Sequence, residues 1–174
     1  MTRSALALLL LTAAACSSPD VPADAPADAS SAATTDAETS GAATPAADAP
    51  VLTVYKSPTC GCCSTWAQAM ERDGFRVETV GTDDLASVRD SLGMPGDLAA
   101  CHIATVGGYA VEGHVPPSAV RRMLADRPDA AGIAVPGMPI GSVGMEQGST
   151  RQPYNVLLVG EDGEATVYEH VPGA

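Results

Sequence analysis

Three of the five cysteines lie together in the segment Cys60-Gly61-Cys62-Cys63. Cys60 and Cys63 have the C-x-x-C spacing, which puts both on one face of a helix, and Cys62 adds a third sulfur. At the N-terminus of a helix, free N–H groups and the helix dipole stabilise thiolates, which attack disulfides and bind soft metal ions. A fourth cysteine, Cys101, follows later. Four sulfurs can therefore meet if the fold brings the two segments together.

These cysteines allow three interpretations: a structural disulfide, thiol-disulfide exchange through Cys60 and Cys63, or metal binding. A structural bridge between Cys62 and Cys63 would be strained, and any other bridge within the cluster would close too small a loop to add much stability. Exchange would use only two of the four sulfurs. We therefore favour a metal site and keep exchange as the alternative.

Clustered thiolates select Cu(I), zinc or iron–sulfur clusters. A structural zinc site commonly uses two C-x-x-C pairs, whereas this sequence has one. Iron–sulfur clusters are normally assembled in the cytoplasm, whereas the N-terminus of this chain predicts export. Bunched cysteines that can bridge neighbouring ions favour a polynuclear Cu(I) cluster. Its expected ligands are Cys60, Cys62, Cys63 and Cys101.

Two histidines and two methionines are further candidate copper ligands. His102 adjoins Cys101, and because neighbours on a strand point to opposite faces, both reach one site only if a strand begins or bulges there. His114 precedes a predicted helix, where it binds the metal, caps the turn or faces solvent. Met138 and Met145 lie in a loop, so core packing explains them less well, and thioether ligands suit Cu(I).

The hydrophobic periodicity predicts a βαβ unit followed by further α/β structure. The expected strands cover residues 51–55, 75–80, 101–106, 109–113, 154–159 and 165–168, and the expected helices run from Thr59 to Gly74, from Asp83 to Gly93 and from Pro116 to Leu124. Residues 133–148 are rich in Gly, Pro and Met, which predicts a loop that closely approaches another segment. This order is compatible with a single thioredoxin-like domain carrying an inserted hairpin and the Gly/Pro/Met-rich loop.

The first fifty residues differ from the rest in composition. Residues 1–15 combine a positive charge with a short apolar run, which predicts a signal peptide rather than a spanning helix. Cys16 is either a lipoprotein acylation site or the residue after an ordinary cleavage site, and we favour acylation. Residues 16–50 are rich in Ala, Pro and Asp and contain no basic or aromatic residue, which predicts a disordered acidic tether.

Residues 51–174 are long enough to form one domain around one core. Acidic residues outnumber basic ones there, and the whole chain has a net charge of −12. Nucleic acids and anionic membrane surfaces attract basic proteins, so the charge argues against both as partners.

Four separated motifs resemble the CopG-type periplasmic copper-resistance proteins. They are Thr59-Cys60-Gly61-Cys62-Cys63, Cys101-His102, Glu112-Gly113-His114-Val115-Pro116, and the segment from Pro136 to Glu146. The resemblance implies a thioredoxin-like domain in the periplasm that binds several copper ions in a cysteine-bridged cluster. It also implies a role in copper resistance and in interconverting Cu(I) and Cu(II).

Three functional hypotheses stay open at this point. The chain is a redox-active copper protein, a passive copper buffer or chaperone, or a thiol-disulfide oxidoreductase that uses Cys60 and Cys63. The first two would serve copper transport or oxidase proteins of the envelope. The expected location is the periplasm or cell envelope, with Cys16 carrying a lipid anchor in the outer membrane.

Overall fold

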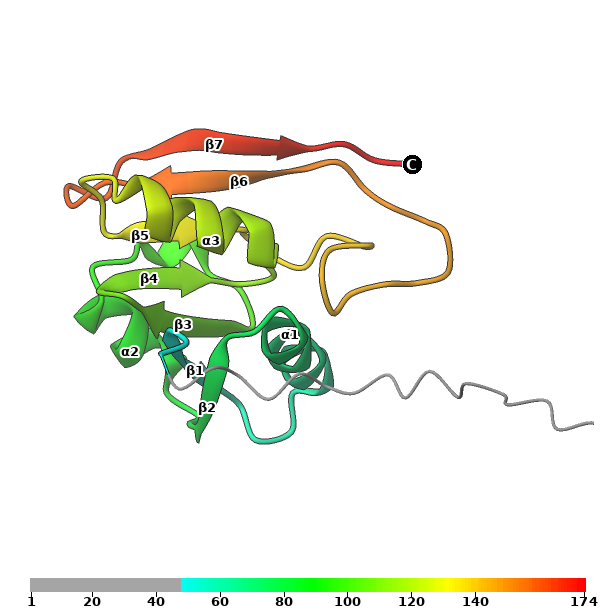
Figure 1. Cartoon of the computed structure of the whole chain (residues 1–174), viewed down its shortest axis with the longest axis horizontal. Coiled ribbons are helices and arrows are strands. Elements are labelled where there is room, and N and C mark those ends of the chain that lie inside the picture. The colour runs from blue at the N-terminus through cyan, green and yellow to red at the C-terminus, as the bar shows by residue number, and fades with distance from the viewer. Residues whose placement is uncertain (1–47) are drawn as a thin grey trace, which may run out of the picture. The chain divides into compact units, whose positions relative to one another are not determined.

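The computed structural model describes residues 48–174, so the predicted signal peptide, Cys16 and most of the predicted tether lie outside the described residues. The described part contains one seven-stranded sheet with the strand order β2-β1-β3-β4-β5-β6-β7, which Figure 1 shows. Within residues 48–174, no helix is long and apolar enough to cross a membrane.

The helices and strands expected from the periodicity are present, with shifted ends. The strands are β1 (Val51–Lys56), β2 (Arg76–Gly81), β3 (His102–Val106), β4 (Tyr109–Glu112), β5 (Gly132–Ala134), β6 (Tyr154–Val159) and β7 (Ala165–Val171). The helices are α1 (Gly61–Arg72), α2 (Leu85–Ser91) and α3 (Pro117–Asp126), with a short 3-10 helix, η1 (Gly96–Leu98).

The first four strands have the thioredoxin-like arrangement. β1, α1 and β2 form a parallel βαβ unit, and β3 runs antiparallel beside β1. β3 and β4 form a hairpin through Gly107-Gly108, whose positive φ angles of 58° and 92° favour glycine, and α3 follows β4. The predicted α/β class and thioredoxin-like fold are confirmed.

Apolar side chains bury both faces of the sheet. On one face, α1 and α3 pack together against the strands, with Trp66 and Val120 fully buried. On the other face, residues of α2 such as Val88 pack beside Ile103 of β3. Side chains of β3 alternate between the two faces, with Ala104 on the first and Ile103 on the second. Because Lys56 at the end of β1 pairs with His102, the start of α1 lies next to the start of β3.

The loop prediction needs a correction at its first residues. We expected the loop to begin at Ile133, but Gly132–Ala134 is a strand that pairs parallel with β4 and antiparallel with β6. A strand of three residues that is buried on both faces is too short to show the alternation of apolar and polar residues that predicts a strand. β5 joins the β6–β7 hairpin to the thioredoxin-like strands in one sheet, and β7 runs to Val171 rather than ending at Tyr168.

The predicted cap of α1 was also wrong. We expected Thr59 to cap the helix, but the N-cap is Cys60, whose Sγ accepts from the backbone N–H of Cys63 at 3.4 Å. The backbone N–H of Cys60 donates to the Ser57 carbonyl, so Thr59 lies within the preceding turn. A sulfur therefore occupies the place where an N-cap oxygen usually lies.

A buried ion pair holds the segment that precedes β3. Arg89 of α2 donates to both carboxylate oxygens of Glu112 in β4, at 2.9 and 3.0 Å. Glu112 also accepts from the backbone N–H of Ala100 at 2.6 Å, and Arg89 donates to the Ala100 carbonyl at 3.4 Å. Both backbone polar groups of the residue before Cys101 are therefore fixed by buried charges.

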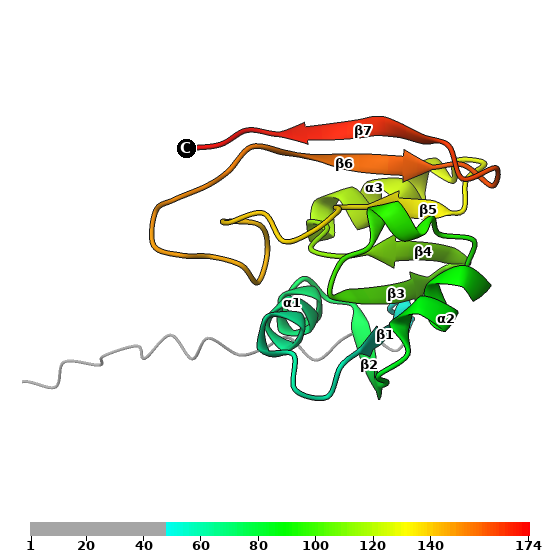
Figure 2. The same ribbon diagram turned by 180° about the vertical axis from the view of Figure 1, so that it is seen from behind.

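The loop between β5 and β6 passes over the first turns of α1 (Figure 2). Gly144 has a φ of 83°, and a Cβ atom built there would lie 2.9 Å from the Cys62 carbonyl oxygen and 2.9 Å from the Trp66 nitrogen. This is the close approach that the glycine-rich composition predicted.

This contact predicts the effect of adding one methyl group. Gly144→Ala should lower the free energy of unfolding by about 1–3 kcal/mol more than Gly148→Ala, measured by urea denaturation, because the new methyl group meets the backbone of α1. Gly148 is a matched control, since its φ of 60° is also positive but nothing lies within 4 Å of its Cβ position. Equal losses in the two variants would show that the loop does not pack tightly on α1.

Candidate metal centre

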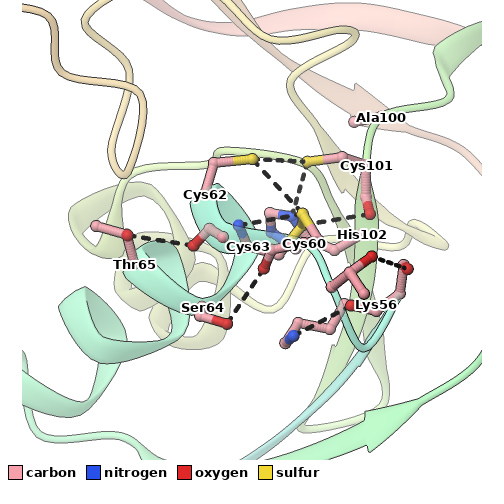
Figure 3. Close-up of a disulfide and its surroundings, with 12 residues drawn as sticks. Lys56, Cys60, Cys62, Cys63, Ser64, Thr65, Ala100, Cys101 and His102 are labelled. Atoms are coloured by element: carbon pink, nitrogen blue, oxygen red, sulfur yellow. Dashed lines mark hydrogen bonds between the residues drawn. A yellow bond between two sulfur atoms is a disulfide. The ribbon is translucent and has the colours of Figure 1, made fainter.

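The C-x-x-C pair lies at the start of α1, and Cys60 and Cys63 are joined by a disulfide (Figure 3). Cys60 is half-buried, whereas Cys63 is fully buried. The first N–H groups of a helix have no partner within it and favour negative charge nearby. The disulfide is the two-electron oxidised form of the pair. Once reduced, the two sulfurs would lie where the helix N-terminus stabilises thiolates.

Two cysteines of the described range, Cys62 and Cys101, are free. Cys62 Sγ lies 3.5 Å from Cys60 Sγ and 3.9 Å from Cys101 Sγ. The ligand atoms of all four cysteines lie within 4.8 Å of one another. A metal–sulfur bond is about 2.3 Å long, so sulfurs this close can share one ion or bridge neighbouring ions after small movements. The fold thus brings together the four sulfurs named from the sequence.

Cys101 and His102 both reach the centre because β3 begins at His102. Cys101 precedes the strand, so the alternation of side chains does not separate the two, and the sulfur lies 3.5 Å from His102 Nδ1. Burial, followed by the neighbouring Cys62 thiol, raises the pKa of Cys101 to about 12. Cys101 is therefore a protonated thiol at neutral pH unless a metal ion compensates the thiolate charge.

His114 presents a ring nitrogen to the same sulfur. Its Nε2 lies 3.1 Å from Cys101 Sγ, and its Nδ1 lies 2.8 Å from the Val143 carbonyl oxygen. Because a carbonyl only accepts, Nδ1 carries the hydrogen, and the neutral ring turns the Nε2 lone pair toward the sulfur. Burial lowers the pKa of His114, which favours this neutral form.

His102 is fully buried between two aromatic rings. Its ring centroid lies 4.4 Å from that of Trp66 and 5.0 Å from that of His114. Within residues 48–174, its Nε2 is the one buried side-chain nitrogen or oxygen without a hydrogen-bond partner. Burial, followed by repulsion from His114, lowers the pKa of His102 to about 3. The ring is therefore neutral and offers a nitrogen lone pair.

The two candidate methionines belong to the loop that covers α1. Met138 is 54% exposed and Met145 is half-buried. Met145 follows Gly144, the residue that packs on Cys62 and Trp66. Contact of either thioether with copper stays a prediction.

Sequence reasoning assigned no role to several residues that shape the centre. The sequence does contain a signal for the role of Glu112. A charged residue at the end of the otherwise apolar strand β4 is expected to be buried, and a buried charge needs a partner of opposite charge. Arg89 has no such signal in its short helix. Val143 orients His114 through its backbone carbonyl, and a contact made by the backbone cannot be predicted from the type of side chain.

The arrangement has two mutually exclusive uses for Cys60 and Cys63. In the disulfide, the two sulfurs are bonded to each other and cannot act as thiolate ligands. Two-electron reduction frees both, and four thiols then face one another. The same residues can therefore serve as a redox couple or as metal ligands, but not as both at once.

Comparison with known proteins identifies relatives of this domain. The family described as "Protein of unknown function, DUF411" matches residues 98–145, which include Cys101, His102 and His114. No curated protein is significantly similar to the chain.

Two similar solved structures are those of the copper resistance protein CopG, called Form 2 and Form 1. Form 2 is 36% identical over 72% of this chain and 100% of its own length, with a TM-score of 0.69. Form 1 is 37% identical over 71% of this chain and 98% of its own, with a TM-score of 0.68. At this identity and coverage, the chain belongs to the CopG family of copper resistance proteins.

Proposed function

We propose that the protein binds copper in the cell envelope and holds Cu(I) in a polynuclear cluster of cysteine thiolates. The observation that carries the proposal is the convergence of four sulfurs within 4.8 Å, from the start of α1 and from the segment before β3. Soft thiolates select Cu(I) over harder ions. The relatives named copper resistance proteins support a role in copper resistance.

The burial of the sulfurs indicates how copper enters. Cys60, Cys62 and Cys101 are half-buried and Gly61 is exposed, whereas Cys63 is fully buried. An incoming ion therefore meets the half-buried sulfurs first. Cys63 completes the cluster from the interior once the disulfide has been reduced.

The disulfide also gives the centre a redox step. When two Cu(II) ions reach the reduced protein, each accepts one electron, while Cys60 and Cys63 lose two protons and form their S–S bond. The products are two Cu(I) ions and the disulfide, so electrons balance without another reactant. The interconversion of Cu(I) and Cu(II) that the family resemblance implies is thus within the chemistry of this centre.

The same proposal places the protein in the periplasm, attached to the outer membrane by a lipid on Cys16 after removal of residues 1–15. The apolar run and the cysteine that follows it support this location. Its partners would be copper transport or oxidase proteins of the envelope. A mature N-terminal peptide without acyl groups, found by mass spectrometry, would refute the anchor.

The cluster makes a prediction about stoichiometry. The reduced full chain, titrated with Cu(I) without oxygen against a chromogenic chelator, should bind two or more copper ions, because bridging sulfurs support several ions. Cys62→Ser should lower the number or the affinity. Cys16→Ser is the matched control and should bind like the unchanged chain. Fewer than two ions per chain, or no effect of Cys62→Ser, would contradict the cluster.

A second candidate function is thiol-disulfide exchange, which the Cys60–Cys63 disulfide specifically favours. Cys60 is half-buried and within reach of an external disulfide, whereas Cys63 is buried behind it. The Cys60 thiolate would attack the substrate, and Cys63 would then attack Cys60 and release the reduced substrate.

Insulin reduction distinguishes this function from copper binding alone. Under exchange chemistry, Cys60→Ser should abolish turnover because the attacking sulfur is lost, whereas Cys62→Ser should keep most of it. The assay is the turbidity of reduced insulin in the presence of a thiol reductant. If the unchanged chain does not accelerate the reaction above the reductant alone, the oxidoreductase candidate is ruled out.

A further inference from the structure

We infer that Lys56 is the counter-ion of the reduced C-x-x-C pair and favours the form of the protein in which Cys60 carries a negative charge. Lys56 is the last residue of β1 and the only lysine in the sequence. It sets how readily the Cys60–Cys63 disulfide is reduced, a role that rests on the proposed redox use of these two cysteines.

The side chain of Lys56 lies on the face of the sheet that α1 covers. Burial alternates along β1, so that Leu52, Val54 and Lys56 are buried, and the first two pack in the same core as Trp66 of α1. Lys56 also pairs with His102 of β3, and directly paired residues point to the same face of a sheet. Lys56 is therefore a buried residue, 7% exposed, on the face that carries the sulfur centre.

Lys56 has no carboxylate partner within residues 48–174. Its Nζ donates to the backbone carbonyl of Ser57 at 3.1 Å, which is a neutral acceptor (Figure 3). Lysines are rarely buried unless they are paired, because moving an unpaired charge out of water is costly. Arg89, the other buried lysine or arginine of the described range, is paired with Glu112. In the disulfide form, the charge of Lys56 is thus left without a counter-ion.

The Ser57 carbonyl also fixes how far this charge lies from Cys60. The same oxygen accepts from the backbone N–H of Cys60, again at 3.1 Å. The ammonium group is therefore held within two hydrogen-bond lengths of the N-cap residue of α1. Its field extends to β3 as well: burial and then His114 lower the pKa of His102 most, and the charge of Lys56 lowers it further.

Reduction supplies the missing negative charge. When two glutathione molecules reduce the protein, the Cys60–Cys63 bond breaks and a glutathione disulfide forms. The protein gains two electrons and one proton, which gives the Cys60 thiolate and the Cys63 thiol, and the second glutathione proton goes to water. The N-terminus of α1 stabilises the thiolate from one side, and Lys56 compensates its charge from the preceding strand. The oxidised form therefore holds a lone buried cation, whereas the reduced form holds an ion pair.

The test measures the equilibrium between glutathione and the disulfide in the copper-free full chain carrying Cys16→Ser. Alkylation followed by intact-mass spectrometry distinguishes the oxidised form, in which Cys62 and Cys101 are free, from the fully reduced form. Lys56→Met removes the charge and should lower the equilibrium constant for reduction by about tenfold or more, because opposite charges attract strongly at this separation. Lys56→Gln is a second neutral variant, which keeps a donor for the Ser57 carbonyl, and should behave in the same way.

Two further variants are the controls. Lys56→Arg keeps the positive charge and should stay within about threefold of the unchanged chain, since the two cations differ in shape and hydration. Arg76→Met removes a positive charge from the start of β2, where Arg76 is exposed and pairs with Val51 at the far end of β1. It should leave the equilibrium constant unchanged.

Urea denaturation of the two redox forms separates this role from a purely structural one. Lys56→Met should not destabilise the oxidised form, because an apolar side chain replaces an unpaired buried charge. It should destabilise the reduced form, since the Cys60 thiolate loses its counter-ion. A residue that only fills space would destabilise both forms equally, and that result would contradict the inference.

Two other results would overturn the role of Lys56: an unchanged equilibrium constant in both neutral variants, or a loss in Lys56→Arg as large as in Lys56→Met. The measurement contains no copper, so it does not depend on how many ions the chain binds. Fewer than two copper ions per chain would end the polynuclear cluster and leave the counter-ion in place. Equal equilibrium constants would end the counter-ion and leave the cluster in place.

Discussion

A guanidinium and a carboxylate meet in the interior between α2 and β4, and the metal centre depends on their contact. Glu112 is fully buried and Arg89 is 6% exposed. Removing one partner of such a pair costs about 3–5 kcal/mol, because the other charge stays buried and unpaired. Since both groups also bond to Ala100, the pair joins a helix, a strand and the segment before β3. The position of Cys101 thus follows from a charge pair outside the sulfur cluster.

In the thioredoxin-like arrangement, one place is suited to both sulfur redox chemistry and metal binding. The start of α1 stabilises negative sulfur, whether the partner of that sulfur is another sulfur or a cation. In this chain Cys62 and Cys101 add two free thiols beside the C-x-x-C disulfide, and the loop after β5 packs against the backbone of Cys62. With these two additional cysteines, a site suited to thiol-disulfide exchange can also bind metal.

Much of the fold followed from the sequence because its signals are local. The alternation in residues 75–80 and the Gly107-Gly108 turn depend on neighbouring residues only, and the structure has a strand and a hairpin there. β5 was missed because its strand character comes from pairing with β4 and β6, which no three-residue pattern carries. Thr59 was predicted as the N-cap of α1 because hydroxyl side chains are common at that position, whereas the sulfur of Cys60 is the N-cap acceptor in the structure.

The candidate site was predictable to a different extent. Spacing and residue chemistry were enough to name the four cysteines, because clustered thiolates are typical ligands of soft metal ions. The orientation of His114 was not predictable, since a backbone carbonyl distant in sequence determines it. The same holds for the segment before Cys101, whose geometry depends on Arg89 and Glu112 from two other elements.

Trp66 has a consequence beyond packing. It is the single tryptophan of the whole chain, its indole N–H donates to the Val115 carbonyl at 2.9 Å, and its ring lies against His102. All tryptophan emission of the protein therefore originates beside the centre. A copper ion bound at this centre would quench that emission, so the fluorescence intensity of Trp66 would report copper binding without an added probe.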